Sequence, residues 1–434
     1  MRVFLLIAMY SVLMASEMFG WKLGFGTGLS IKNGFLYVLL LGIALELLIH
    51  RRPGDALTIP VNGFFLALIA YALASWLITD REYQFAGYTH GERFISLKGL
   101  LIDHYLFFAV YFYGTRTQKE AVRVTIFVLI LFVIGNLITL MDAYDMPDLG
   151  LIKWIAGRIS GPLGEPNQYA AFSVMFLPTL VALTIRNGVS LRVLFGLGAL
   201  ATIAVILLTG SRGGAVGMIG GLAVGSIVMR RYISPGRIVK VIVLVAPLAI
   251  VALGVVASKF SGLLEERVEQ SSAGNLRDAS AGRTMIWETG LRVQAEDPAL
   301  FLWGRGWDTF RPEVRQASHN TYLEYLFNLG VIGLGLYLGL IASITRLQLY
   351  GLTGATGDER LLIIGFVLGW LCMLIAVFFV NLFNPWVFVW AYTGLVSRIA
   401  VHCAPARQRT TALSVRANSR LLSQPEAGHS RVTA

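Results

Sequence analysis

The sequence predicts an all-α, polytopic membrane protein with about twelve transmembrane helices. The first observation is composition, because 56% of the 434 residues are hydrophobic and the mean hydropathy is +0.67. The second is charge, because 14% charged residues are too few to cover a soluble domain, which carries about 25%. The third is an alternation of apolar stretches with loops that differ in their Lys and Arg content.

Apolar stretches close to the length needed to cross a bilayer, roughly 17–25 residues, recur along the whole chain. The glycine-rich stretch 215–229 has the weakest such pattern. The predicted spans are residues 3–19, 35–49, 57–79, 96–113, 122–141, 169–185, 193–209, 215–229, 238–257, 321–343, 361–380 and 386–399.

The basic residues orient these spans. With the N-terminus inside, inner loops hold about 20 Lys and Arg, and outer loops other than 258–317 hold about 8, as the positive-inside rule requires. Both termini are therefore expected in the cytoplasm. The net charge of +11 follows from this orientation and does not require nucleic acid. The expected organisation is a transmembrane domain (1–402) with a large outer loop (258–318), and a basic, disordered cytoplasmic tail (403–434).

The large outer loop contains a predicted amphipathic helix over residues 283–296. Ile286, Gly290 and Val293 share one face, and Arg292 lies on another. Such a helix lies either on the membrane surface or against the bundle. A second outer segment, "DMPDLGLIKWIAGRISGPLGEPNQY", contains Pro and Gly residues that argue against a simple helix.

Arg212 in "LLTGSRGGAVG" is the first candidate for chemistry, because a charged residue beside a span is costly and a functional candidate by default. Its glycine neighbours let a backbone or ligand approach closely. An arginine fork binds phosphate in a bidentate manner. The structural alternative is a tight turn whose arginine extends to lipid headgroups.

Two further candidates lie on the outer side. Arg283 is expected in the first turn of its helix, with Ser280 as a nearby cap, and its alternative is a surface arginine. His319 is expected in the first turn of the next span, capped by Ser318. The helix dipole and two nearby arginines would keep its imidazole neutral, the form that a general base needs. The alternative is a histidine among headgroups.

Other polar residues are weaker candidates. Asn320, Tyr322 and Glu324 could orient His319 or bind sugar hydroxyls, although structural roles are the simpler interpretation. Asp142, Asp145 and Asp148 resemble a metal cluster but have no histidine partner, so no metal site and no cofactor are predicted. Two arginines and one base at the outer face instead fit a diphosphate held by fixed cations, and a hydroxyl nucleophile activated by histidine.

At this point the sequence resembles the O-antigen ligase and polysaccharide polymerase superfamily of bacterial inner membranes. The resemblance covers roughly residues 161–337, and its motifs occur in the family's order. They are "GPLGEPNQYAAF", "TGSRGG", "GRTMIWETGLRV" with "GRGWDTF", and "SHNTYLEYLFNLGVIGLGLY". Glu165 and Asn167 in the first motif, with Asn320 and Tyr322 in the last, become candidate supporting residues.

The resemblance implies an all-helical fold similar to GT-C-like, metal-independent membrane glycosyltransferases. It implies a glycan donor on undecaprenyl diphosphate, Arg212 and Arg283 as diphosphate binders, and His319 as activator of an acceptor hydroxyl at the periplasmic face. A ligase would use lipid A-core or a protein as acceptor, and a polymerase would use another lipid-linked glycan. The long loop and its arginine-to-histidine order resemble a ligase, which we favour.

Two other classes compete with the enzyme. A transporter of a lipid-linked anion could also use outer arginines, but such folds are often built from repeats and place charges at mid-membrane depth. No repeat relates the two halves of this sequence, and its spans are nearly free of charge. A structural membrane scaffold would not need His319 beside two arginines.

Overall fold

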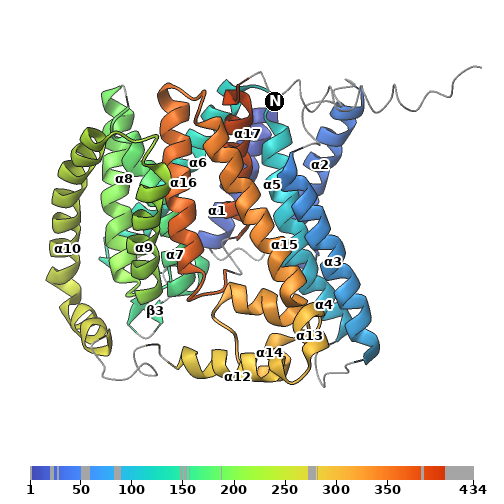
Figure 1. The fold of residues 1–434 in the computed structure, drawn as a ribbon. Coiled ribbons are helices and arrows are strands. Elements are labelled where there is room, and N and C mark those ends of the chain that lie inside the picture. Colours follow the sequence, from blue (N-terminus) through green and yellow to red (C-terminus); the bar gives the residue numbers. More distant parts are fainter. Residues whose placement is uncertain are drawn as a thin grey trace, which may run out of the picture.

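The computed structural model describes residues 2–19, 24–26, 29–49, 59–82, 89–146, 150, 154–155, 157–186, 188–271, 280, 282–382 and 386–405, and it is almost entirely helical (Figure 1). The helices of the first half are α1 (Arg2–Met18), α2 (Ile31–Ile49), α3 (Pro60–Glu82), α4 (His90–Leu97), the π-helical turn η1 (Lys98–Ile102), α5 (Asp103–Gly114), α6 (Gln118–Ala143), α7 (Pro166–Leu183) and α8 (Val189–Leu208). The second half contains α9 (Arg212–Met229), α10 (Pro235–Ser271), α12 (Arg283–Ala295), α13 (Pro298–Trp303), α14 (Phe310–Val314), α15 (Thr321–Gly351), α16 (Gly357–Ala376) and α17 (Trp386–Cys403).

Each of the twelve predicted spans coincides with a helix, counting α4, η1 and α5 as one rod. Within the described residues, seven helices are long and apolar enough to cross a membrane, and three shorter apolar helices accompany them. The glycine-rich α9 is one of the seven. The predicted all-α, polytopic membrane fold is therefore confirmed. The tail beyond residue 405 lies outside the described part.

Short strands occur only in the connections of the described chain. Strands β1 (Gly24–Gly26) and β2 (Leu29–Ser30) form one antiparallel ribbon, and β3 (Trp154–Ile155) and β4 (Arg158–Ile159) form another. The second ribbon and a single 3₁₀ turn, η2 (Gly161–Leu163), lie in the Pro- and Gly-containing outer segment. In its described residues before Pro166 this segment forms no α-helix, as its composition predicts.

The beginning and end of the described bundle lie on the same side. The Arg2 guanidinium pairs with Glu120 at the start of α6, with 3.0 Å between nitrogen and oxygen. Gln118, two residues earlier, contacts the Cys403 sulfur at the end of α17. Helices α12, α13 and α14 lie at the opposite end, below the bundle in Figure 1. Helices α12 to α14 of the large loop and the described ends of the bundle thus occupy opposite sides, as the predicted topology requires.

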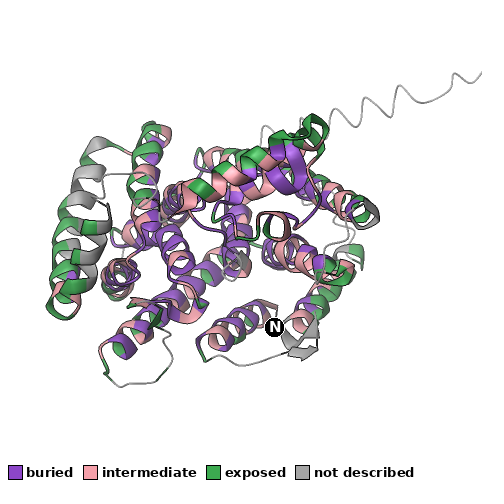
Figure 2. Ribbon diagram, turned by 90° about the horizontal axis from the view of Figure 1, so that it is seen from below, coloured by how far each residue is buried: buried purple, intermediate pink, exposed green. Residues whose placement is uncertain are grey.

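Helix α16 packs extensively against both α7 and α9, and these two helices also contact each other. Helix α7 is buried along almost its whole length. Glycines recur every fourth residue in α9, and at Gly221 an added Cβ would overlap the Cys372 backbone of α16. Small residues at such spacing let membrane helices approach closely. Figure 2 shows the result, with buried residues on inward faces and exposed residues on the outside.

The substitution Gly221→Ala is expected to destabilise the protein by about 1–3 kcal/mol, because the new methyl group overlaps α16. Gly254→Ala in α10 is the matched control, since an added Cβ there meets nothing within 4 Å. That control gains helix propensity and should leave stability equal or slightly higher. Thermal unfolding in detergent measures both. Equal unfolding midpoints for the two variants would contradict the close packing of α9 on α16.

Candidate active site

Helix α12 is fastened to the segment that carries His319. Its apolar face, with Ile286, Trp287 and Val293, packs against a small core of Phe310, Leu323 and Phe327 from α14 and α15. Trp287 also donates its indole N–H to the Ser318 carbonyl at 2.9 Å. The amphipathic helix predicted over 283–296 therefore lies against the bundle, which decides between the two predicted positions.

Arg212 is the first residue of α9. Ser211 caps this helix, because its hydroxyl accepts a hydrogen bond from the Gly214 amide at 3.2 Å. The Arg212 residue is half-buried. An added Cβ at the next residue, Gly213, would lie 2.7 Å from Phe379 Cβ, so only glycine lets the α9 start approach the end of α16 this closely. The close approach predicted at these glycines is thus made by another part of the protein, at Phe379 just after α16.

Asn167 joins two of the sequence motifs. Its side-chain oxygen accepts from the Ser211 hydroxyl at 3.0 Å and from Arg158 Nη2 at 2.7 Å. Its side-chain nitrogen donates to Glu165 Oε1 at 2.8 Å. Glu165 in turn caps α7 by accepting from the backbone amides of Asn167 and Gln168. The start of α7 and the start of α9, which carries Arg212, are therefore held together by one amide.

Arg158 is a member of this network that sequence reasoning missed. Besides binding Asn167, its Nε donates to the Thr209 carbonyl at 2.6 Å. Thr209 lies three residues before Arg212, so Arg158 fixes the turn that leads to α9. The only signal in the sequence was a basic residue in an outer segment rich in Pro and Gly.

Arg283 begins α12. The cap position is Gly282, which has φ of 77° and supplies no side-chain hydrogen bond. Ser280 therefore lies near the start of the helix, as predicted, but is not the cap itself. Ser280 still accepts from the Thr284 amide at 3.4 Å. Partial burial lowers the pKa of the Arg283 guanidinium, the Glu165 carboxylate opposes this shift, and the Arg212 charge adds to it.

His319 lies two residues before the helix in which it was predicted. Asn320 caps α15 by accepting from the Leu323 amide at 3.0 Å, and the helix begins at Thr321. The prediction that Ser318 is the cap is therefore wrong. The Ser318 hydroxyl instead donates to Glu324 Oε2 and accepts from Asn381 Nδ2, both at 2.7 Å. These two partners satisfy the hydroxyl, so the cap falls to Asn320.

The backbone of His319 adopts φ of 48°, in the left-handed region. Non-glycine residues there cost about 1–2 kcal/mol, and such strained positions cluster at functional sites. Ser318 and Asn320 on either side are both buried, and the Asn320 amide donates to the Ser318 hydroxyl at 3.3 Å. The surrounding hydrogen bonds thus fix the backbone from which the imidazole projects.

The environment favours the neutral form of His319. Desolvation by the surrounding protein lowers the pKa of the imidazole, and the Arg283 charge lowers it further, while Glu165 acts in the opposite direction. The predicted neutral imidazole is supported. Its principal cause is desolvation, and the arginine that contributes is Arg283.

The electrostatic contacts unite residues from four distant parts of the sequence. Glu165 interacts with both Arg283 and His319, and Arg283 also interacts with Arg212. Two half-buried guanidinium groups close to each other repel, and a polyanion placed between them relieves the repulsion. The arrangement is therefore suited to an anionic group held beside a neutral base.

The side chains of Asn320 and Tyr322, the other predicted supporting residues, form hydrogen bonds within the protein. Asn320 caps α15, and the Tyr322 hydroxyl donates to the Leu374 carbonyl of α16 at 2.7 Å. Both therefore position the start of α15 behind His319. Among the described residues, no group of three or more His, Cys, Asp or Glu side chains is arranged to hold a metal ion.

Residues 197–338 match the protein family described as O-antigen ligase. The matched part runs from α8 into α15 and contains Arg212, Arg283 and His319. No curated protein shows significant sequence similarity to the chain. The match confirms the resemblance to the O-antigen ligase and polysaccharide polymerase superfamily. It indicates a multi-pass membrane protein with glycosyltransferase-like activity on lipid-linked glycans in general.

Proposed function

Within this superfamily, we propose that the chain is an O-antigen ligase-type enzyme of the bacterial inner membrane. It transfers a glycan from undecaprenyl diphosphate to a hydroxyl of lipid A-core, without a metal ion and with inversion at the anomeric carbon. The observation that carries the proposal is the convergence of Arg212, Arg283 and His319, with Glu165, at one end of the bundle.

The proposed chemistry assigns one role to His319 and another to the two arginines. The acceptor hydroxyl gives its proton to the neutral His319 imidazole as its oxygen attacks the anomeric carbon. The bond from that carbon to the diphosphate oxygen breaks on the opposite face. Arg212 and Arg283 stabilise the charge that develops on the departing diphosphate, a task for fixed cations in a site of low dielectric constant. The site lies on the side of the bundle opposite the chain ends. We assign the side of the site to the periplasm and both termini to the cytoplasm.

The test is transfer by the purified protein in detergent or liposomes. A short glycan on undecaprenyl diphosphate is offered with lipid A-core, or with no acceptor beyond the donor itself. Glycosylated lipid A-core supports the ligase, and a ladder of longer lipid-linked glycans without added acceptor supports the polymerase instead. EDTA should leave the rate unchanged. Loss of transfer with EDTA and recovery with a divalent ion would contradict the arginine mechanism.

The pH dependence of kcat/KM for the free enzyme should show an acidic limb with an apparent pKa below 6.5, the ordinary value for histidine. Because burial and Arg283 lower the pKa of His319, the neutral base persists to lower pH, and activity is lost as the pH falls through that pKa. Removing the positive charge in Arg283→Gln should move the limb to higher pH. Removing the negative charge in Glu165→Gln should move it to lower pH.

Measured as normalised kcat/KM profiles, these two shifts have opposite signs even though both variants lose activity. A merely structural role for the two residues would lower the rate at every pH and leave the position of the limb unchanged. Shifts in the same direction would contradict the assignment of the limb to His319.

A further inference from the structure

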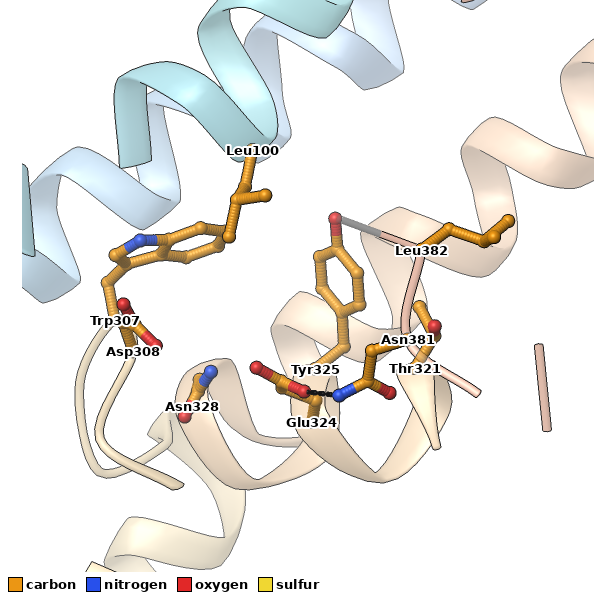
Figure 3. Close-up of a pocket in the computed structure, with 9 residues that line it drawn as sticks. All are labelled: Leu100, Trp307, Asp308, Thr321, Glu324, Tyr325, Asn328, Asn381 and Leu382. Atoms are coloured by element: carbon orange, nitrogen blue, oxygen red, sulfur yellow. Dashed lines mark hydrogen bonds between the residues drawn. The ribbon is translucent and has the colours of Figure 1, made fainter. Parts of the chain in front are cut away.

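The hydroxyl of Ser318, the residue directly before His319, lies in a closed triangle of hydrogen bonds. It donates to Glu324 Oε2 of α15 and accepts from Asn381 Nδ2, both at 2.7 Å. The same Asn381 nitrogen also donates to Glu324 Oε2, a bond that Figure 3 shows. Ser318 is 1% exposed and Asn381 is 5% exposed, so water hardly competes for these bonds. Ser318, Glu324 and Asn381 are named the Ser318 triangle below.

Residues 377–381, which follow α16, hold the chain on both sides of His319. Before it, Asn381 takes part in the Ser318 triangle. After it, the Thr321 amide donates to the Val377 carbonyl at 3.0 Å. The base is therefore carried by a short stretch that is fastened at its two ends to one segment.

The same segment contacts the two helices that begin with the arginines of the candidate site. An added Cβ at Gly213, the second residue of α9, would lie 2.7 Å from Phe379 Cβ. The Phe378 ring packs edge-on against Trp287 of α12, with centroids 5.3 Å apart. Residues 377–381 thus lie against the starts of α9 and α15 and against α12. A shift of Ser318 away from this segment would move the base relative to both arginines.

His319 needs such support, because its backbone φ of 48° lies in the left-handed region. A non-glycine residue keeps this conformation only where the surrounding structure over-determines it. A general base must also lie within hydrogen-bond reach of the proton that it takes. A misplacement of about 1 Å can lower the rate about 10²-fold. The side chains that fix this backbone are therefore expected to influence the rate of transfer.

We propose that Glu324 and Asn381 are positioning residues for the transfer reaction, acting on His319 through the Ser318 hydroxyl. The inference rests on the proposed function, because it takes His319 as the base. The sequence allowed an orienting role for Glu324, and the structure adds Asn381 and the route through Ser318. Glu324 supplies the acceptor and Asn381 the donor, so the triangle needs one carboxylate and one amide.

Exchanging the two groups tests this assignment with almost unchanged side-chain shapes. Asn381→Asp places a second carboxylate against Glu324, and because like charges repel at this distance, the triangle opens. Adding Glu324→Gln restores one carboxylate and one amide in exchanged places. We expect kcat to fall about 10–10²-fold in Asn381→Asp and to return close to wild type in the double variant. The KM values for donor and acceptor should stay unchanged in both.

Gln348→Glu is the matched control. Gln348 is a buried amide near the other end of α15, and it donates to the Ser397 hydroxyl at 3.0 Å. The control also introduces a buried carboxylate beside a serine, so it should lower the unfolding midpoint as Asn381→Asp does. Its kcat should nevertheless match wild type. An equal loss of kcat in the control would reduce the effect of Asn381→Asp to general destabilisation and overturn the proposal.

Hydrogen exchange of the backbone amides in residues 318–321 gives a readout that needs no turnover. The Asn320 amide donates to the Ser318 hydroxyl at 3.3 Å. It should exchange slowly in wild type and in the double variant, and faster in Asn381→Asp. A wild type that transfers no glycan to any acceptor would contradict the proposed function, and the exchange pattern would still test the triangle.

Three outcomes would overturn the positioning role alone. The first is equal exchange of these amides in all three proteins. The second is an active wild type whose kcat is unchanged by Asn381→Asp, or whose loss appears in KM instead. The third is a double variant that is no more active than Asn381→Asp, since the exchanged carboxylate and amide would then fail to replace the original pair.

Discussion

Replacing His319 with asparagine is expected to lower glycan transfer about 10²–10⁴-fold, because the acceptor hydroxyl loses the group that takes its proton. Asparagine is the informative choice for this position. It tolerates the left-handed backbone conformation, φ of 48°, that alanine would strain, and its amide cannot serve as a base at neutral pH. The rate is measured with both substrates saturating, so that the loss appears in kcat.

Donor binding and the unfolding midpoint should remain close to wild type in His319→Asn, since Ser318 and Asn320 keep the hydrogen bonds that hold the segment. His90→Asn is the matched control. His90 is also at the start of a helix, and its ring stacks on Trp76 with centroids 3.9 Å apart. A His319→Asn enzyme that retained more than about a tenth of the wild-type rate would remove His319 from proton transfer.

Hydropathy predicted every long helix of the described fold, because a helix in a bilayer must satisfy its backbone internally and expose apolar side chains. It could not show why α9 is a span despite its many glycines. The reason lies in α16, where Cys372 passes so close to Gly221 that no side chain fits between them. Hydropathy likewise could not show that α7, which begins with several polar residues, is buried along almost its whole length. Contacts between helices decide these cases, and no single apolar stretch contains them.

Site residues could be predicted from the sequence where the residue type and its position beside a span leave few possible functions. Arg212, Arg283 and His319 stood out because charged and titratable groups beside spans are costly. The cap of α15 was not predictable, because Ser318 and Asn320 are both good capping residues. The choice depends on Asn381 and Glu324, which occupy the Ser318 hydroxyl, and Asn381 lies more than sixty residues further along the chain. Trp287 gave only an amphipathic signal, and its bond to the Ser318 carbonyl appears only in three dimensions.

The substitution Arg212→Lys is expected to lower kcat/KM about 10²-fold or more, although it keeps the positive charge. A lysine ammonium is a compact charge on a flexible stem and cannot reproduce the planar, bidentate grip of a guanidinium on a diphosphate. The backbone at this position is fixed by the Ser211 cap and by Asn167, so the shorter reach of lysine is not corrected by movement of α9. Arg192→Lys is the control, because Arg192 is exposed, lies at the other end of α8 from Arg212, and donates hydrogen bonds to the Arg186 carbonyl.

If Arg212 and Arg283 hold one diphosphate, their substitutions should not be additive. Removing either guanidinium weakens the grip on the departing diphosphate, so removing the second then costs less activity than removing it alone. The double variant with Arg212→Lys and Arg283→Lys should therefore lose less activity than the product of the two single losses. Inorganic diphosphate provides a readout that is independent of turnover, since it should raise the unfolding midpoint of wild type and of neither single variant. Near-normal transfer by Arg212→Lys, or fully additive losses in the double variant, would mean that Arg212 interacts with lipid headgroups and not with the donor. Non-additive losses together with diphosphate binding that needs both guanidinium groups would instead identify them as the two halves of one anion site, in agreement with the electrostatic interaction between Arg212 and Arg283.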